Sequence, residues 1–246
     1  MTTHTSNTAA TAAKPATPVQ RQIVSFRFFR MDPAWKRLAA DVRKQHAAEL
    51  ETVVNRHRQW LMINTYSLIG LKADVDFLIW RVGPTLESVQ AFSTEVQQHT
   101  AIGSYIATTY SYLSMTKRST YVDKFDPTHQ DRRLFITPAQ SRYLFVYPFV
   151  KTRQWYLLPL AERQQMMDEH IRIGMKYPSV RLHTTYSFGL DDQEFVVAFE
   201  TDKAEDFLDL VQELRESQGS VYTLRDTPIF TCVLKPLNQL LQDLGG

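Results

Sequence analysis

The stretch Thr65-Tyr66-Ser67-Leu68-Ile69-Gly70-Leu71 returns later in the chain as Thr185-Tyr186-Ser187-Phe188-Gly189-Leu190. Both copies run through acidic residues into an apolar stretch, at residues 75–80 and 193–199. The offset of 120 residues between Tyr66 and Tyr186 recurs in four further identical pairs, namely Phe29 and Phe149, Trp35 and Trp155, Leu38 and Leu158, and Arg43 and Arg163. Similarity at one fixed offset predicts two copies of one structural unit.

The second copy indicates which elements one unit contains. Residues Arg142–Phe149 are rich in Tyr, Phe, Val and Leu, which is typical of a strand. A helix is expected from Pro159 to about Lys176, because the following Tyr177-Pro178 disfavours helical geometry. Two strands at about 180–188 and 193–201, a helix over Ala204–Glu216 and a strand over Ile229–Leu234 are expected to follow. This order is that of a ferredoxin-like unit.

The predicted fold is therefore α+β, with two ferredoxin-like units that form a dimeric α+β barrel within one chain. Residues 1–21 are mostly Thr, Ala, Ser and Pro, which predicts a disordered tail. The N-terminal unit is expected to span residues 22–123 and the C-terminal unit residues 141–246. Residues 124–140, mostly polar and with two prolines, are the expected linker.

The composition excludes several classes of protein. The 246 residues are 43% hydrophobic and 22% charged, as in a globular protein, and the formal net charge of +2 argues against a dedicated binder of nucleic acid or membrane surfaces. Cys232 is the only cysteine, so neither an internal disulfide nor a cysteine-based metal cage can form. No apolar run reaches the roughly 18 residues of a membrane span. We therefore expect a soluble, cytoplasmic protein.

The two copies differ where the second gains chemical groups. His170 corresponds to Leu50, Lys151 to Met31, and Tyr147 to Arg27. An imidazole, an ammonium and a phenol thus come together in the second copy, whereas positions that are alike in both copies are typical of packing. A catalytic site is therefore expected in the C-terminal unit, and the N-terminal unit is expected to bind no cofactor.

His170 is the residue with the clearest candidate role. It lies within a predicted helix in the segment Met166-Met167-Asp168-Glu169-His170-Ile171. A single histidine suits haem iron, which takes one protein ligand, better than zinc, which takes three or four. The alternative interpretation is a histidine at the edge of the core. The chain has no Cys-x-x-Cys-His motif, so any haem would be bound non-covalently.

Four segments together resemble the chlorite dismutase family, which includes the peroxide-dependent coproheme decarboxylases of haem synthesis. They are Tyr147-Pro148-Phe149-Val150-Lys151, Trp155-Tyr156, His170, and Tyr186-Ser187-Phe188-Gly189-Leu190-Asp191-Asp192-Gln193-Glu194-Phe195. The similarity covers residues 22 to 240 and agrees with that family's duplicated ferredoxin-like barrel. It also implies a homo-oligomer, with a pentamer as the expected form.

The resemblance implies roles for single residues. His170 matches the histidine that coordinates the iron of haem b or iron coproporphyrin III, and Lys151 matches a lysine that contacts a propionate, as a flexible point charge can. Trp155 matches a tryptophan packed beside that histidine, although its counterpart Trp35 keeps a purely structural role open. Arg225 and Thr231 are further candidates for propionate contacts.

Tyr147 distinguishes the activities within the family. In the decarboxylases, a tyrosine at this position is oxidised with hydrogen peroxide and removes a hydrogen from a propionate, which then loses carbon dioxide to leave a vinyl group. The chlorite dismutases tend to have an aliphatic residue here, which cannot perform one-electron chemistry. The alternative for Tyr147 is an ordinary strand tyrosine.

Two positions depart from the family pattern. Where chlorite dismutases have an arginine opposite the iron ligand, counting back from Gly189 gives Leu182 and counting forward from His170 gives His183. His183 could act as an acid–base group toward peroxide or be a strand histidine, while Arg181 should point to the opposite face. The acid expected to hydrogen-bond the iron ligand corresponds to either Glu216 or Gln218.

The sequence therefore predicts a haem-dependent oxidoreductase resembling coproheme decarboxylase, with a porphyrin substrate and hydrogen peroxide as oxidant. Two alternatives remain open. One is decomposition of chlorite to chloride and dioxygen, and the other is a haem carrier, haem sensor or cofactor-free member without catalytic activity.

Overall fold

The computed structural model describes residues 20–122 and 135–246, which we call the N-terminal and C-terminal halves. Residues 1–19 of the predicted tail and residues 124–134 of the predicted linker lie outside the described residues. The N-terminal half contains β1 (Ile23–Met31), a 3₁₀ helix η1 (Pro33–Arg37), α1 (Ala40–His57), β2 (Met62–Ser67), β3 (Phe77–Gly83), α2 (Leu86–His99), η2 (Ala101–Tyr105) and β4 (Ile106–Met115).

The C-terminal half follows a similar order. It contains β5 (Tyr143–Lys151), α3 (Arg153–Leu157), α4 (Leu160–Met175), β6 (Arg181–Tyr186), β7 (Phe195–Thr201), α5 (Ala204–Glu216), η4 (Gln218–Tyr222), β8 (Thr223–Arg225), β9 (Phe230–Leu234) and α6 (Leu237–Asp243). The predicted α+β class is confirmed, and α5 has the predicted bounds. The elements α3, β8 and α6 were not predicted from the sequence.

The strands form one large antiparallel sheet with the neighbour order β7-β6-β4-β1-β3-β2-β9-β5-β8. β2 pairs with β9 and β4 pairs with β6, so strands of the two halves hydrogen-bond to each other at two places. β5 pairs in addition with β7, which makes the list of neighbours return to its starting strand. The sheet therefore has an inner face shared by both halves and an outer face that helices can cover.

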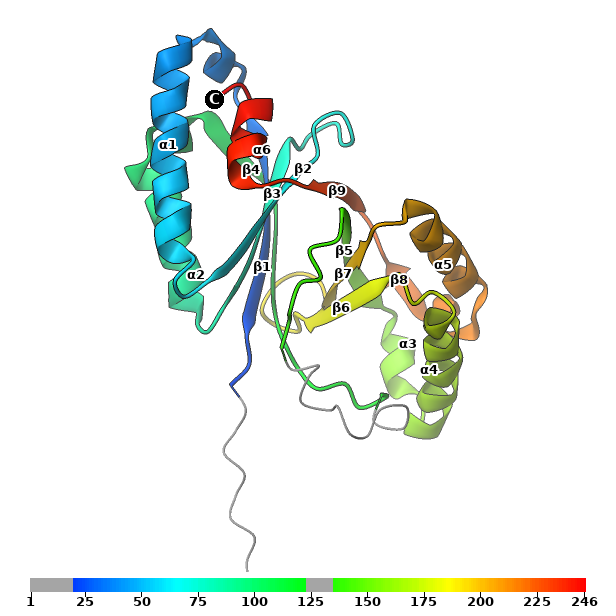
Figure 1. Ribbon diagram of the computed structural model, residues 1–246. Helices are drawn as coiled ribbons and strands as arrows, with labels where there is room; N and C mark the ends of the chain where they lie inside the picture. The colour runs from blue at the N-terminus through cyan, green and yellow to red at the C-terminus, as the bar shows by residue number, and fades with distance from the viewer. Residues whose placement is uncertain (1–19, 123–134) are drawn as a thin grey trace, which may run out of the picture.

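Helices cover the outer face of the sheet in two groups, with α1, α2 and α6 against the N-terminal half and α3, α4 and α5 against the C-terminal half (Figure 1). The shared inner face is an apolar core with residues from both halves, including Phe26, Trp80, Leu144 and Phe230. In the described part of the chain, no helix has both the length and the apolar character that a membrane span requires.

The two helix-covered faces are packed differently. The core under α1 and α2 includes Trp35 and Leu50, and α6 adds Leu237, Leu240, Leu241 and Leu244. The Trp35 indole donates a hydrogen bond of 2.8 Å to the carbonyl of Leu244, which fixes the end of the chain over this half. The core under α4 and α5 is smaller, and several apolar residues around it are exposed, namely Leu157, Leu160, Met175, Leu182, Leu208 and Leu224.

An acidic residue holds the end of the first strand in each half. The backbone N–H of Met31 donates to the Asp76 carboxylate over 2.7 Å, and the backbone N–H of Lys151 donates to the Glu194 carboxylate over 2.8 Å. The turn before each acid contains a glycine, Gly70 or Gly189, whose φ angle is positive. Other residues rarely adopt this backbone conformation. The repeated sequence therefore forms the same turn and the same anchor twice.

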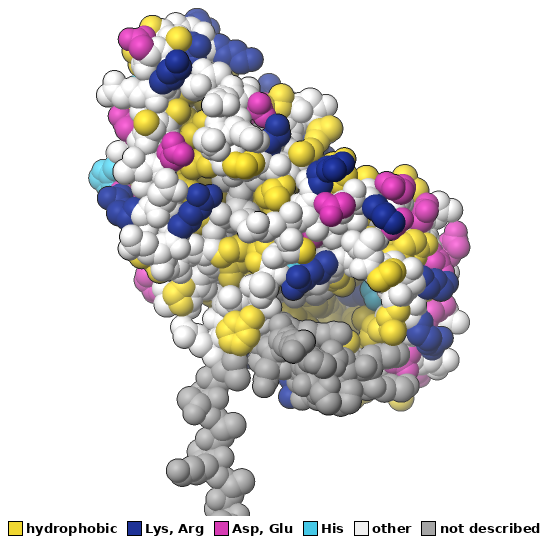
Figure 2. Space-filling model, viewed as in Figure 1, with side chains coloured by type: hydrophobic (Ala, Val, Ile, Leu, Met, Phe, Trp, Pro, Cys, Tyr) yellow, Lys and Arg dark blue, Asp and Glu magenta, His cyan; other side chains and the backbone are white. Residues whose placement is uncertain are grey.

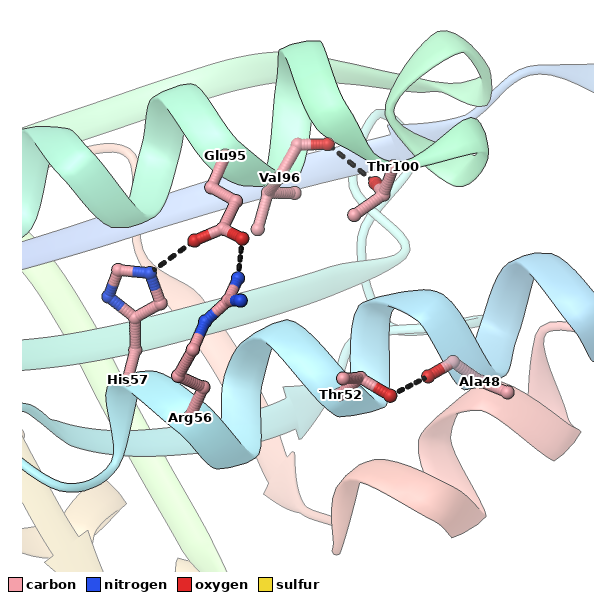
Figure 3. Close-up of polar contacts among 7 residues, drawn as sticks. All are labelled: Ala48, Thr52, Arg56, His57, Glu95, Val96 and Thr100. Carbon is pink, nitrogen blue, oxygen red and sulfur yellow. Dashed lines mark hydrogen bonds and ion pairs between the residues drawn. The ribbon is translucent and has the colours of Figure 1, made fainter.

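Glu95 joins the two long helices of the N-terminal half. Its carboxylate accepts from His57 Nε2 over 2.8 Å and forms an ion pair with Arg56, so it points from α2 toward α1 (Figure 3). Two hydroxyls bond within single helices, since Thr52 donates to Ala48 and Thr100 donates to Val96. The only acid in the middle of α2 is thus engaged by basic groups of α1.

We expect Leu240→Ala to lower the free energy of unfolding by about 2–5 kcal/mol, because Leu240 is only 1% exposed and its loss leaves a cavity under α6. Urea unfolding followed by circular dichroism measures this change. The matched control is Leu208→Ala on α5, where the side chain is 62% exposed and we expect a change within about 0.5 kcal/mol. Equal effects of the two substitutions would contradict the assigned packing.

Candidate functional site

The candidate site lies between the outer face of the C-terminal sheet and α4. Tyr147 lies on β5 opposite Val197 of β7, and its ring is 6.0 Å from that of Phe199. Ile173 of α4 belongs to the same apolar cluster as Tyr147. His170 lies three residues before Ile173, on the same side of the helix. The fold thus brings the predicted phenol and imidazole to one layer of the structure.

The Tyr147 hydroxyl is protonated at neutral pH. Burial raises its pKa well above the usual value, the Asp226 carboxylate raises it further, and Arg215 acts in the opposite direction. Asp226 and Arg215 form an ion pair of 2.8 Å, so the two charges near Tyr147 partly cancel. A buried, protonated phenol has the form needed to give up a hydrogen atom.

Lys151 lies at the end of β5 with its ammonium held in place. Its Nζ donates to the carbonyl of Gly219 over 2.7 Å and lies 4.6 Å from the ring centre of Trp155. Trp155 on α3 is buried, so it forms a fixed wall against which the lysine packs. Burial lowers the pKa of Lys151 to about 8, and Glu194 opposes that shift. The side chain is therefore a positioned cation at neutral pH.

Glu194 organises the residues around Lys151. Besides the Lys151 backbone N–H, its carboxylate accepts a hydrogen bond of 2.5 Å from the Tyr156 hydroxyl and lies 3.7 Å from Arg153. No role for Glu194 was predicted from the sequence, where it stands within the segment that resembles the family. Its correspondence with Asp76 in the first copy was the available signal, because both acids end the turn that precedes the apolar strand.

His170 is half-buried and its imidazole is neutral. Burial lowers its pKa to about 4, the Lys151 ammonium adds to the shift, and Glu169 opposes it. No hydrogen bond to the ring is found within residues 20–122 and 135–246. A neutral imidazole has a free lone pair on one nitrogen, which is the form that binds a metal ion.

Neither candidate for the acid beside His170 bonds to its ring. The backbone N–H of Gln218 donates to the Glu169 carboxylate over 3.1 Å, which joins η4 to α4 next to His170. Glu216 lines a surface cavity of about 240 Å³ together with Tyr177 and Glu213. The choice between Glu216 and Gln218 thus has no support from a direct contact.

Strand register determines which faces Leu182 and His183 occupy. Leu182 lies opposite Phe199 in the β6–β7 pair, and directly opposed residues of antiparallel strands point to the same face. Leu182 therefore points to the face that holds Tyr147, and it is 45% exposed there. Of the two candidates, Leu182, which was obtained by counting back from Gly189, is the one that lies on the face of Tyr147.

His183 points to the inner face of the sheet. It lies opposite Ala198, its Nε2 is 2.7 Å from the buried Glu200 carboxylate, and its ring is 5.6 Å from Trp80 of the other half. The proposed acid–base role of His183 toward peroxide is at odds with this geometry, because alternation along β6 directs it away from Tyr147. Arg181 has the same parity, so it also points away, as alternation predicted.

The two further propionate candidates are separated by the sheet. Arg225 lies opposite Val150 in the short β5–β8 ladder, whose register shifts between Val150 and Lys151. Burial raises the pKa of the Tyr112 hydroxyl on β4, and the charge of Arg225 opposes that shift. The guanidinium of Arg225 therefore lies near Tyr112, which belongs to the inner core. Thr231 lies opposite Phe145 and so points to the side of Tyr147.

Figure 2 shows a hollow in the C-terminal half, lined by hydrophobic side chains, with a histidine side chain in view and basic groups at its rim. A neutral imidazole, a fixed ammonium and an apolar lining fit an iron porphyrin, which has a metal centre, carboxylate substituents and flat apolar faces. The residues of the outer face therefore suit this group.

Comparisons with known proteins identify the family of the chain. The chlorite dismutase family model matches residues 43–235. The chain belongs to the chlorite dismutase family. A coproheme decarboxylase of Mycolicibacterium smegmatis is 32% identical over 166 residues, which cover 68% of this chain and 70% of that relative. The resemblance stated from the quoted motifs is thus confirmed.

Solved structures of the chlorite dismutase family have the same fold. A variant of the chlorite dismutase from Candidatus Nitrospira defluvii gives a TM-score of 0.83 at 26% identity, covering 92% of this chain and 95% of that chain. A haem-binding protein from Thermus thermophilus gives a TM-score of 0.84 at 25% identity, covering 92% and 95%.

We expect His170 in the porphyrin-free protein to titrate with a midpoint near 4, measured by NMR of the ring protons, because burial and Lys151 both disfavour the charged ring. Lys151→Met introduces the residue found at the same place in the first copy, and it should raise this midpoint toward 6.5. The control Lys176→Met removes an exposed ammonium at the end of α4 and should leave the midpoint unchanged.

The sign of the pH effect on stability follows from the same shift. The folded-state pKa of His170 lies below the usual value of 6.5, so the unfolded chain binds the extra proton first as the pH falls. The stability contributed by neutral His170 is complete above about pH 6.5 and declines toward pH 4. The decline should be shallower in His170→Gln, and an identical decline would contradict the assigned burial.

Proposed function

We propose that the protein is a haem-binding oxidoreductase that acts as a peroxide-dependent coproheme decarboxylase. The observation that best supports this activity is the position of Tyr147, whose buried phenol lies in the same layer as His170. The curated relative from Mycolicibacterium smegmatis carries the name of this activity. The substrate is then iron coproporphyrin III, the product is haem b, and the oxidant is hydrogen peroxide.

The proposal includes the duplicated architecture. We infer two ferredoxin-like units, residues 22–123 and 141–246, that form a dimeric α+β barrel within one chain. The matched anchors at Asp76 and Glu194, and the pairing of β5 with β7 that returns the strand order to its start, support this view. In the first unit, α6 packs in the same core cluster as Trp35 and Leu50, the counterparts of Trp155 and His170, so we propose that only the second binds a porphyrin.

Each residue of the site has a proposed task. His170 would provide the nitrogen ligand to the iron, Lys151 would bind a propionate through its ammonium, and Trp155 would hold that ammonium in place. Thr231 remains a candidate for a second propionate contact, and Arg225 is a weaker one because its charge acts on Tyr112 of the inner core. When bound, the iron porphyrin supplies the one-electron oxidising chemistry that peroxide drives.

Tyr147 performs the step at the substrate carbon. Its hydroxyl gives up a proton and an electron, and the resulting phenoxyl radical takes a hydrogen atom from the propionate side chain. Loss of carbon dioxide and a second electron then leaves a vinyl group. For each propionate, one hydrogen peroxide accepts the two electrons and, with the released protons, becomes two water molecules. The opposite charges of Asp226 and Arg215 partly cancel each other near the phenol during this cycle.

The side chain of Leu182 favours decarboxylation over chlorite decomposition. We propose that Leu182, and not His183, lies opposite His170 across the bound group, because only Leu182 points to that face. An aliphatic side chain offers no positive charge to an oxyanion such as chlorite. The solved chlorite dismutase structures keep chlorite decomposition as the second candidate function, and a haem carrier or sensor is the non-catalytic alternative.

We also propose a cytoplasmic homo-oligomer, with a pentamer as the expected form. The exposed apolar residues on the helices of the C-terminal half, such as Leu157 and Leu160, support contacts between copies.

We expect iron coproporphyrin III added to the purified chain to give a Soret band with saturable binding. His170→Ala should weaken or abolish that band, because it removes the ligand nitrogen. Lys151→Met should lower the porphyrin affinity about tenfold through loss of one charge-assisted hydrogen bond. Visible absorption titrations measure both effects. A wild-type chain that gives no band at all would remove every haem function from consideration.

We expect Tyr147→Phe to retain porphyrin binding and to lose decarboxylation on titration with peroxide, because phenylalanine has no hydroxyl hydrogen to give up. Mass spectrometry of the extracted porphyrin measures the loss of two carboxylates. The matched control is Tyr143→Phe, which removes another β5 hydroxyl from the same face and should stay active. Full activity of Tyr147→Phe would contradict the mechanism, and oxygen release from chlorite at an electrode would favour the second candidate.

A further inference from the structure

Two arginines lie on the outer face of the N-terminal sheet. In the β1–β3 pair, Arg81 lies opposite Ser25 and Arg27 lies opposite Ile79, so the two arginines are diagonal neighbours on one face. The same register in the second half gives Phe199 opposite Phe145 and Tyr147 opposite Val197. The arginines therefore occupy in one half the places that Phe199 and Tyr147 occupy in the other.

Arg81 is a buried cation held by neutral groups. Its side chain is 2% exposed, with Nη1 donating to the Val89 carbonyl and to Ser93, and Nη2 donating to the Ser25 hydroxyl over 2.6 Å. Its Nε–H is buried without an acceptor. Its guanidinium also lies 5.2 Å from the ring centre of Phe92. None of these contacts neutralises the charge.

Arg27 is half-buried and oriented by two neutral acceptors. Its Nε donates to the Thr108 hydroxyl over 3.0 Å, and its Nη2 donates to the Gln97 side-chain oxygen over 3.2 Å. Within the described residues, no group accepts a hydrogen bond from Nη1. One edge of a positioned guanidinium thus retains donors that no part of the fold uses.

No carboxylate in the described part of the chain forms an ion pair with either arginine. Across residues 20–122 and 135–246, no ion pair includes Arg27 or Arg81. Glu95 lies on α2 between Ser93 and Gln97, the two residues that bond the arginines, yet its carboxylate points to Arg56 and His57 of α1 (Figure 3). The acid best placed to serve as a counter-ion is therefore already engaged.

The electrostatic consequence is a site that favours an anion. Burial, together with the charge of Arg27, lowers the pKa of Arg81 to about 9, and burial also lowers the pKa of Arg27. Buried charges in proteins are normally paired, because an unpaired one loses its hydration without compensation. An external anion beside Arg27 would supply the missing partner.

We propose that the outer face of the N-terminal half binds a small oxyanion, of the phosphate or carboxylate class, at Arg27 with Arg81 behind it. The planar guanidinium of Arg27 matches two oxygens of such an anion, and Thr108 and Gln97 hold it in place before binding. This site is separate from the candidate porphyrin site, which lies under α4, and does not depend on it.

Isothermal titration of the full chain with inorganic phosphate, at constant ionic strength set by chloride, tests the proposal. The wild type should bind one phosphate per chain with a saturable isotherm. Arg27→Gln should bind at least tenfold more weakly, because it removes the charge and the fork of donors. A parallel titration with acetate shows whether the site prefers a carboxylate or a phosphate.

The control variant is Arg30→Gln, which removes an exposed arginine from the same strand and should leave phosphate affinity within about twofold. Circular dichroism establishes that both variants fold. Tight binding of either anion by wild type and Arg30→Gln, but not by Arg27→Gln, supports the site. Saturable binding that survives in Arg27→Gln, or no saturable binding of phosphate or acetate by the wild type, overturns it.

Discussion

The pairing of strands between the two halves is the constraint on which the rest of the structure depends. β2 with β9 and β4 with β6 join the halves, and β5 with β7 returns the order to its start. This arrangement turns one face of β1, β2, β3, β4, β5, β7 and β9 toward a common apolar core. The other face must then be covered by helices, because an exposed apolar sheet face is unstable in water. Two separate helix-covered layers result, and each can hold different chemistry.

The two layers use equivalent positions in opposite ways. Under α1 and α2, aliphatic residues and α6 fill the space, and Leu50 is buried where the second half has His170. Under α4 and α5, Tyr147, Lys151 and His170 replace apolar or cationic residues, and the core is smaller. Burial then keeps the imidazole neutral and the phenol protonated, while Trp155 and Glu194 position Lys151. The chemistry of the candidate site thus depends on the smaller apolar core under α4 and α5, which leaves room for polar side chains.

Much of this was predictable because the pattern of the sequence repeats. The helix over Ala204–Glu216, the strand expected at about 193–201 and found at Phe195–Thr201, and the repeated turns at Gly70 and Gly189 follow from local periodicity and backbone preference. The concentration of chemical groups in the second half followed from comparing the copies. The helix α6 was not predicted, since Leu237–Asp243 is short and its stability comes from packing on Trp35.

The sequence by itself determined the family, the α+β class and which half holds the imidazole, the ammonium and the phenol, because residue identity and spacing are written along the chain. Only the tertiary structure decided which side chains face each other. Leu182 and His183 are adjacent in sequence and point to opposite faces, and a loop of uncertain length shifts any count by one. The charge of Arg225 acts on Tyr112 of the inner core, and that neighbourhood exists only once the strands have paired.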